Sequence, residues 1–400
     1  MPRVLGFDPG TISLDICGLE DGRVFLDRTL PTGPELGARV LEAVAQAGPI
    51  DLALGPSGYG LPLLPIADVG ERELRLAFLP ERDARHLGTG GDRGEAAQPS
   101  AAGTTGARPE GIEGLRALVR SLRATDLPVL FSPGVVHLPT VPAQRKVNRI
   151  DLGTADKVCA AALAIHDQAT RLGVPPAETA FVLVEVGGAF TAVLAVEGGA
   201  IVDGRGGSSG PPGFLGSGAL DGEVAALLGH VGKRQVFSGG AADVAGFEGK
   251  GKGKGEGKGE GKGNGKGNRD SPEIVAARAD PAARAAVAFL VEGVVRAVAG
   301  ELALVGAARE ILLSGRLVGI PAWRAALERA LVPLRPVRRV GTLGARVKEA
   351  AQGAALLADG LAGGRFAPIV ESLRLREATG TALDHLYLEG AAAAARRMLE

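Results

Sequence analysis

The sequence predicts an α/β protein made of two related lobes, each a mixed β-sheet covered by helices. Three observations predict this class. The chain has 400 residues, more than one hydrophobic core usually serves, and 46% of them are apolar. A pattern of three short strands joined by tight turns occurs twice with the same internal spacing. Each copy is followed by alternating helical and strand-like segments, as a mixed sheet with flanking helices requires.

The repeat places an acidic residue at the end of an apolar strand and a glycine two residues later. The first copy runs through residues 4–7, Asp8-Pro9-Gly10-Thr11, 12–19, Asp21-Gly22 and 24–26. The second copy runs through residues 181–184, Glu185-Val186-Gly187-Gly188, 190–196, Gly198-Gly199 and 201–202. Asp8 therefore corresponds to Glu185, and Gly22 to Gly199, without a gap. An ordered set of such matches indicates duplicated lobes.

Helix and strand patterns follow each copy in the order that a layered sheet needs. We expect helices at 35–47, 112–123, 155–172, 220–228, 282–305, from 322, and at 345–361, with strands at 51–54, 128–131 and 310–313. We divide the chain into a first lobe (1–150), a linking helix (151–172), a second lobe (173–366) and a C-terminal segment (367–400). Whether that last segment returns to the first lobe is left open.

Two segments interrupt this order. Residues 88–111 are rich in Gly, Ala, Thr and Pro without an apolar period, which predicts a flexible surface loop. Residues 249–268 alternate Gly with Lys, Glu or Asn, and such a segment cannot bury enough apolar area to offset backbone ordering. We expect it to be disordered. Weak phosphate or RNA binding is its alternative role.

Composition excludes several classes of function. Lys plus Arg equals Asp plus Glu at 45 each, so the chain lacks the basic surface that nucleic acid or an anionic membrane attracts. The two cysteines, Cys17 and Cys159, have no metal-ligand spacing and suggest a reducing compartment. The N-terminus has no pattern of a secretory leader, and the apolar stretch 282–306 carries four charged residues. We therefore expect a cytoplasmic protein.

The two acidic turns can bind a polyphosphate from both sides. Glycines in a tight turn expose backbone N–H groups, which form an anion-binding concavity. The first turn adds a carboxylate for Mg²⁺ and two hydroxyl groups, so its candidates are Asp8, Gly10, Thr11 and Ser13. The second turn contributes Gly187, Gly188 and Thr191. A single turn of this kind would be read as an ordinary hairpin with an edge carboxylate, but the repeat favours a nucleotide site.

The two turns resemble the two phosphate motifs of the superfamily of acetate and sugar kinases, heat-shock ATPases and actin. Residues 311–316, which end in Ser314, Gly315 and Arg316, look like its adenosine motif, although Ser314 replaces the first of two glycines. Within the superfamily, the chain is most similar to the predicted butyrate kinases of archaea and bacteria. The similar segments are residues 7–11, 151–157, 185–191 and 207–213. The resemblance implies duplicated actin-like, ribonuclease H-like lobes, ATP and Mg²⁺ as cofactors, and Asp8 and Glu185 as metal candidates.

A kinase that phosphorylates a carboxylate needs charge neutralisation and alignment more than a general base, because the acceptor is already ionised. The candidate groups are Asp151, Asp156, Lys157 and Arg205. Lys157 is the first choice, because a cation at a helix N-terminus is unfavourable unless an anion compensates it. Asp156 is equally well explained as a favourable charge in the first helical turn. The glycine-rich segment 204–218, which contains Arg205, is expected to act as a lid.

The first hypothesis is an ATP-dependent kinase acting on a small carboxylate. The alternatives are a sugar or other hydroxyl kinase, with a base such as Asp151, and an ATP-hydrolysing conformational switch. The expected partner is a small-molecule substrate, with no nucleic acid and no membrane. The oligomeric state is left open between a monomer and a homodimer.

Overall fold

Two five-stranded sheets with the same strand order form the framework of the protein. The computed structural model describes residues 1–10, 13–79, 110–246 and 269–400. In each sheet, three antiparallel strands are extended by two parallel ones. The first sheet contains, in spatial order, β3 (Arg23–Pro31), β2 (Ser13–Glu20), β1 (Arg3–Pro9), β4 (Leu52–Gly55) and β5 (Val129–Phe131). The second contains β8 (Ala200–Arg205), β7 (Thr191–Glu197), β6 (Ala180–Val186), β9 (Glu310–Ser314) and β10 (Val337–Arg339).

The hairpins that begin the two sheets match residue for residue. Asp8 pairs with Asp15 across β1 and β2, and Glu185 pairs with Ala192 across β6 and β7. Each second strand also has an irregularity at the equivalent place, between Gly18 and Leu19 and between Ala195 and Val196. The predicted duplicated α/β fold is confirmed, and the equivalence extends to the register of the strands.

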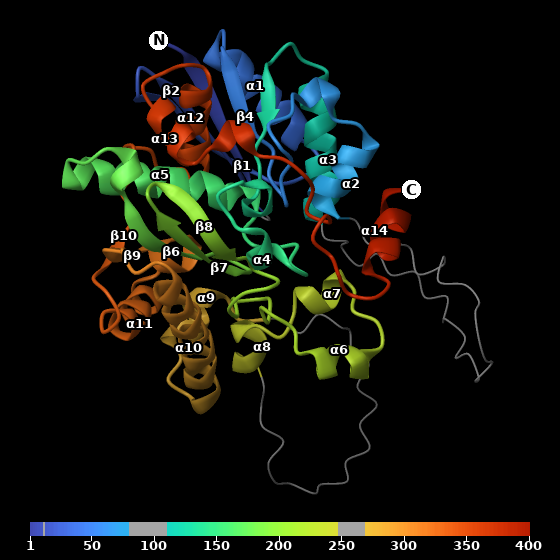
Figure 1. Ribbon diagram of the computed structural model, residues 1–400, viewed down its shortest axis with the longest axis vertical. Coiled ribbons are helices and arrows are strands. Elements are labelled where there is room, and N and C mark those ends of the chain that lie inside the picture. The colour runs from blue at the N-terminus through green and yellow to red at the C-terminus, as the bar shows by residue number, and fades with distance from the viewer. Residues whose placement is uncertain (11–12, 80–109, 247–268) are drawn as a thin grey trace, which may run out of the picture.

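Helices cover both faces of both sheets (Figure 1). In the first half of the chain they are α1 (Leu36–Ala47), α2 (Glu71–Phe78), α3 (Glu110–Arg123), α4 (Ala143–Lys146) and α5 (Ala155–Leu172). The second half contains α6 (Gly222–Leu228), α7 (Lys233–Val236), α8 (Ala241–Ala245), α9 (Pro272–Ala277), α10 (Pro281–Leu304), α11 (Pro321–Leu331), α12 (Glu349–Leu361), α13 (Ala367–Ser372) and α14 (Ala391–Leu399). No helix in the described ranges is long and apolar enough to cross a membrane.

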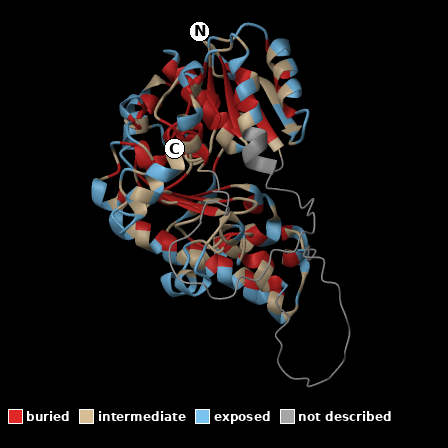
Figure 2. Cartoon of the chain, turned by 90° about the vertical axis from the view of Figure 1, so that its right-hand side faces the viewer, coloured by how far each residue is buried: buried red, intermediate tan, exposed pale blue. Residues whose placement is uncertain are grey.

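Helices α12 and α5 lie between the two sheets and create a continuous core. Successive strand residues face opposite sides of a sheet, so each central strand contributes to two cores. Phe181 and Leu183 of β6 join the core that α5 and α12 share with the first sheet, whereas Val182 and Val184 join the core under α10. The buried residues accordingly form bands on both sides of each sheet (Figure 2). The first lobe has its own outer core beneath α1 and α3.

Glycines allow the layers around α12 to approach closely. A Cβ atom on Gly353 of α12 would lie 1.8 Å from the carbonyl oxygen of Cys159 in α5. On the opposite side of α12, a Cβ atom on Gly6 of β1 would lie 2.1 Å from the amide nitrogen of Ala355. Both distances are far below van der Waals contact, so only glycine fits at these two positions.

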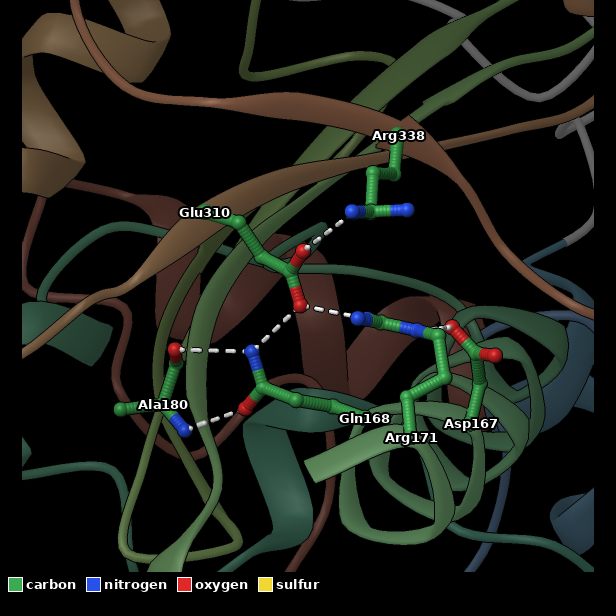
Figure 3. A network of polar contacts seen from close by, with 6 residues as sticks. All are labelled: Asp167, Gln168, Arg171, Ala180, Glu310 and Arg338. Carbon is green, nitrogen blue, oxygen red and sulfur yellow. Dashed lines mark hydrogen bonds and ion pairs between the residues drawn. The ribbon is translucent and has the colours of Figure 1, made fainter.

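The C-terminal end of α5 is fixed to the second sheet by a network of polar contacts (Figure 3). Gln168 accepts a hydrogen bond from the amide of Ala180 at 2.8 Å and donates one to Glu310 at 2.7 Å. Arg171, one turn further along α5, pairs with the same Glu310 carboxylate at 2.5 Å. Because Glu310 is largely buried, these charge-assisted contacts are well shielded from water. These contacts anchor the C-terminal end of α5 to the second sheet.

One predicted helix begins later than the sequence indicates, and two predicted loops lie almost wholly outside the described residues. The helix expected over 345–361 begins at Glu349, because Asp27 of β3 accepts hydrogen bonds from the amides of Arg346 and Val347, at 2.9 Å each. Those bonds hold the preceding residues outside the helix and place Lys348 at its start. The expected loop over 88–111 and the 249–268 segment lie outside the described residues, except that Glu110 and Gly111 begin α3.

The C-terminal segment ends beside the first lobe. Helix α14 packs against α2, and Arg75 of α2 donates a hydrogen bond at 2.9 Å to the carbonyl of Leu399. Further back in the same segment, Asn148 accepts hydrogen bonds from the amides of Tyr387 and Leu388. The residue limits that we assign to the lobes stay a prediction.

Candidate functional site

The first hairpin ends in two buried carboxylates. Asp8, at the end of β1, and its cross-strand neighbour Asp15 are 5% and 2% exposed. The turn closes through a hydrogen bond of 2.8 Å from the amide of Gly10 to the carbonyl of Ser13. Ser13 also donates its hydroxyl to Asp15 at 3.2 Å. Thr11, a predicted phosphate ligand, lies outside the described residues.

The second hairpin repeats this geometry around Glu185. The amide of Gly187 donates a hydrogen bond of 2.9 Å to the carbonyl of Phe190, as Gly10 does to Ser13. Thr191 follows at the start of β7, and its buried hydroxyl finds no hydrogen-bond partner within the described part of the chain. A buried hydroxyl without a partner costs about 1–3 kcal/mol, so it is a group that a ligand could satisfy.

Each hairpin has its own lysine partner. Lys157, in the first turn of α5, pairs with Asp156 at 2.6 Å and with Glu185. Lys348, immediately before α12, pairs with Asp15 at 2.8 Å and lies 3.6 Å from Asp8. Each lysine thus stands at the N-terminus of one central helix and is held by two acids. We call the six residues the carboxylate–lysine cluster: Asp8, Asp15, Asp156, Lys157, Glu185 and Lys348.

The cluster has more acids than bases. Four carboxylates face two lysines, which leaves an excess of two negative charges when all six are ionised. Burial, together with the charge of Asp156, raises the pKa of Asp8 to about 7 despite the nearby Lys348. Burial also raises the pKa of Glu185 against the opposing effect of Lys157. The cluster is therefore short of positive charge.

A divalent cation would supply that missing charge. Mg²⁺ commonly uses only one or two protein carboxylates and takes its other ligands from water and substrate phosphates. Asp8 and Glu185 fit this role, because each lies near the end of a strand beside a glycine-containing turn. No group of three or more His, Cys, Asp or Glu side chains is gathered for a metal within the described ranges. The residues thus suit a cation that arrives with a polyphosphate.

The predicted adenosine motif lies beside the second hairpin. Ser314, at the end of β9, pairs in parallel register with Glu185. Gly315 follows with φ of +96°, and a Cβ atom there would lie 2.6 Å from the carbonyl oxygen of Val186. A Cβ atom on Gly188 would lie 3.5 Å from Cδ of Arg316. The strand order of the second sheet therefore brings together two motifs that are about 130 residues apart.

Asp151 lies beside the cluster but has a structural set of partners. Its carboxylate accepts hydrogen bonds from the amide and the hydroxyl of Ser208, at 3.0 and 3.1 Å, and from the amide of Gly153 at 3.2 Å. Burial raises the pKa of Asp151 in spite of these donors. A Cβ atom on Gly206 would overlap the carboxylate at 1.7 Å. Asp151 thus holds the glycine-rich loop after β8.

Tyr59 brings the first lobe into contact with that loop. Burial is the main cause of a strongly raised pKa of its phenol, which is hydrogen-bonded to Ser208. The ammonium of Lys233, in α7, lies 5.5 Å from the centre of the Tyr59 ring. Sequence reasoning missed Tyr59, although its position between two glycines in a chain with two tyrosines was a possible signal. It also missed Asp15 and Lys348.

Arg205 lies against helix α10. Its Nε atom donates to Glu301 at 2.8 Å, and Glu301 is fully buried. Burial and the charge of Asp203 raise the pKa of Glu301 to about 7. The role of Arg205 in phosphoryl transfer therefore stays a prediction, whereas Lys157 and Asp156 lie together with Glu185.

Glu301 makes the stability of the protein depend on pH. Its pKa in the folded state, about 7, is above its ordinary value of 4.5. Between these values the folded chain retains a proton that the unfolded chain releases, so stability falls as pH rises through this window. We expect the free energy of unfolding of Glu301→Gln, measured by urea titration, to exceed that of wild type by about 2 kcal/mol at pH 8. The difference should be smaller at pH 5. An equal difference at both pH values would contradict this expectation.

The comparisons with known proteins concern the family and the fold. The model of the family described as "Protein of unknown function (DUF1464)" matches residues 6–388. No curated protein matches the chain by sequence.

Three solved kinases share the fold over most of both chains. A propionate kinase from Francisella tularensis subsp. tularensis SCHU S4 is 12% identical, with 89% of this chain and 98% of that chain covered and a TM-score of 0.56. An acetate kinase from Entamoeba histolytica is 10% identical, with 83% of this chain and 87% of that chain covered and a TM-score of 0.53. Porphyromonas gingivalis acetate kinase is 13% identical, with 89% of this chain and 98% of that chain covered and a TM-score of 0.51.

Proposed function

The chain belongs to the family described as "Protein of unknown function (DUF1464)", and we propose that it is an ATP-dependent phosphotransferase that phosphorylates a small carboxylate. The observation that carries the proposal is the carboxylate–lysine cluster, in which two equivalent turns and the starts of both central helices meet. The fold shared with acetate and propionate kinases supports the same class of reaction. The resemblance to predicted butyrate kinases suggests a short acyl chain for the acceptor.

Three residues of the cluster have direct roles in this proposal: Asp8, Lys157 and Glu185. In the second turn, the amide of Gly188 and the buried hydroxyl of Thr191 bind phosphate oxygens, and Asp8 and Glu185 hold the cation that accompanies them. Bound Mg-ATP would supply the phosphoryl group that is transferred. Ser314, Gly315 and Arg316 bind the nucleoside end. Lys157 neutralises charge on the equatorial oxygens, which is the main requirement when the acceptor is already an anion.

A hydroxyl kinase is the less favoured alternative. Such an enzyme needs a carboxylate free to accept the proton of the acceptor hydroxyl. Asp151, the sequence candidate for this base, already accepts three hydrogen bonds from its own chain. A panel of carboxylates and sugars, with ADP release as the readout, tests this choice. ATP hydrolysis that no acceptor stimulates would instead favour the conformational switch.

Mg-ATP should raise the melting temperature of the wild-type protein. At a concentration about 100 times Kd, binding stabilises the folded state by about 2.7 kcal/mol. Asp8→Asn should fold, because burial holds the pKa of Asp8 at about 7 and asparagine resembles its neutral form. The variant should lose the magnesium-dependent part of the shift, whereas the exposed Asp68→Asn should retain it. An undiminished shift in Asp8→Asn would remove Asp8 from the site.

A further inference from the structure

A pocket lies between the glycine-rich loop after β8 and helix α10. Its volume is about 310 Å³, and it is lined by residues that include Arg149, Arg205, Arg296, Pro211, Pro212 and Ala297. The three arginines come from three separate places: the segment before α5, the end of β8 and the middle of α10. This volume is at the lower end of the range for pockets that bind small molecules. We call it the arginine pocket.

Two of the arginines, Arg149 and Arg205, are anchored by short hydrogen bonds, and all three keep most of their donors. Arg149 donates to the carbonyl of Ser209 at 3.0 Å, and Arg205 donates to Glu301 at 2.8 Å. Arg296 lies 3.4 Å from Glu292, which is the turn before it on α10. Each contact uses one of the five N–H donors of a guanidinium. Three arginines and two glutamates leave an excess of one positive charge around the pocket.

The pocket and the carboxylate–lysine cluster have no residue in common. They are connected through the loop that forms the pocket wall. Ser209, which accepts the hydrogen bond of Arg149 through its carbonyl, follows Ser208, which donates to Asp151. A ligand that contacts this wall would restrain the loop that Asp151 and Tyr59 hold.

We propose that the arginine pocket binds the phosphate group of a small phosphorylated molecule. Three guanidinium groups that line one pocket suit a dianion with several acceptor oxygens better than a monoanionic carboxylate. The wall formed by Pro211, Pro212 and Ala297 offers apolar contact to a short carbon skeleton. A site for such a molecule lies beyond the phosphotransfer reaction and does not depend on it.

Calorimetric titration of the full-length protein with phenyl phosphate, without nucleotide, tests the proposal. Wild type should bind, and Arg296→Gln should bind at least about tenfold more weakly, because one charge-assisted contact is lost. This variant should fold, since the side chain of Arg296 is 80% exposed. Arg149→Gln should show a similar loss. Arg329→Gln, which removes an exposed arginine from α11, should bind like wild type.

Three results would overturn the assignment. No binding to wild type, or binding that neither pocket variant weakens, would exclude the pocket as the site. Equal affinity for acetate at the same ionic strength would exclude a preference for phosphate. Inorganic phosphate binding as tightly as phenyl phosphate would show that the carbon skeleton makes no contact. Because nucleotide is absent throughout, failure of the kinase proposal leaves each of these results unchanged.

Discussion

Lys157→Met is expected to lower kcat for ADP production by about 100-fold or more, with a much smaller effect on KM. The group that neutralises equatorial oxygens acts mainly in the transition state, so its loss lowers kcat. The variant should also lose about 3–5 kcal/mol of stability, because Asp156 and Glu185 then lack their shared cation. Steady-state kinetics below the melting temperature and urea unfolding measure the two effects separately.

The double variant Lys157→Met, Asp156→Asn separates the catalytic role of Lys157 from its role in balancing buried charge, because it leaves the proposed metal ligand Glu185 in place. It removes one charge of each sign, so much of the stability should return while ADP production stays low. Recovery of both together would show that Lys157 only balances buried acids. A single Lys157→Met variant within about threefold of wild-type activity, a loss under 1 kcal/mol, would remove the main residue-level support for a carboxylate acceptor.

Gly353→Val should lower the free energy of unfolding by at least about 3 kcal/mol. A Cβ atom there would lie 1.8 Å from a backbone oxygen of α5, so the two central helices must separate. The free energy of unfolding of folded proteins is only about 5–15 kcal/mol, so such a loss is a large part of the total. The midpoint of urea unfolding, followed by circular dichroism, measures the change.

Gly222→Ala is the matched control for this substitution. Gly222 is also helical, and a Cβ atom on it meets nothing within 4 Å. Alanine is the better helix former, so we expect an unchanged or slightly higher midpoint. A Gly353→Val midpoint equal to that of wild type would show that α5 and α12 are not in this contact in solution.

The fold could be predicted from the sequence because hydrophobic periodicity and turn spacing are visible within short stretches of the chain. The repeated acid–glycine spacing at Asp8 and Glu185 predicted two hairpins, and the structure shows them in the same register. The site was predicted in part. Lys157, Asp156 and Glu185 were each singled out from their position at a helix start or strand end, and the fold brings them together.

Residues that reach the site by tertiary contact had no comparable local signal. Lys348 lies late in the second lobe in sequence, yet it pairs with Asp15 near the beginning of the chain. Its position depends on Asp27, which holds the two residues before it out of helix α12. Arg205 was predicted as a site residue from the sequence, but in the structure it donates its hydrogen bond to Glu301. That buried partner lies 96 residues away in sequence and could not be found from local patterns.

The crossing of α5 and α12 at Gly353 would limit how far the charged groups move in any rotation of the lobes about it. Lys157 is two residues from the contact at Cys159, and Lys348 is five residues from Gly353. At 1.5 Å per residue, both lie within about 8 Å of the crossing along their helices. With so short a lever arm, rotation about the crossing would displace these lysines little. Paired spin labels on α1 and α11 should therefore report a larger nucleotide-dependent change than labels near the crossing, and the cluster would stay assembled while the outer ends of the lobes move apart.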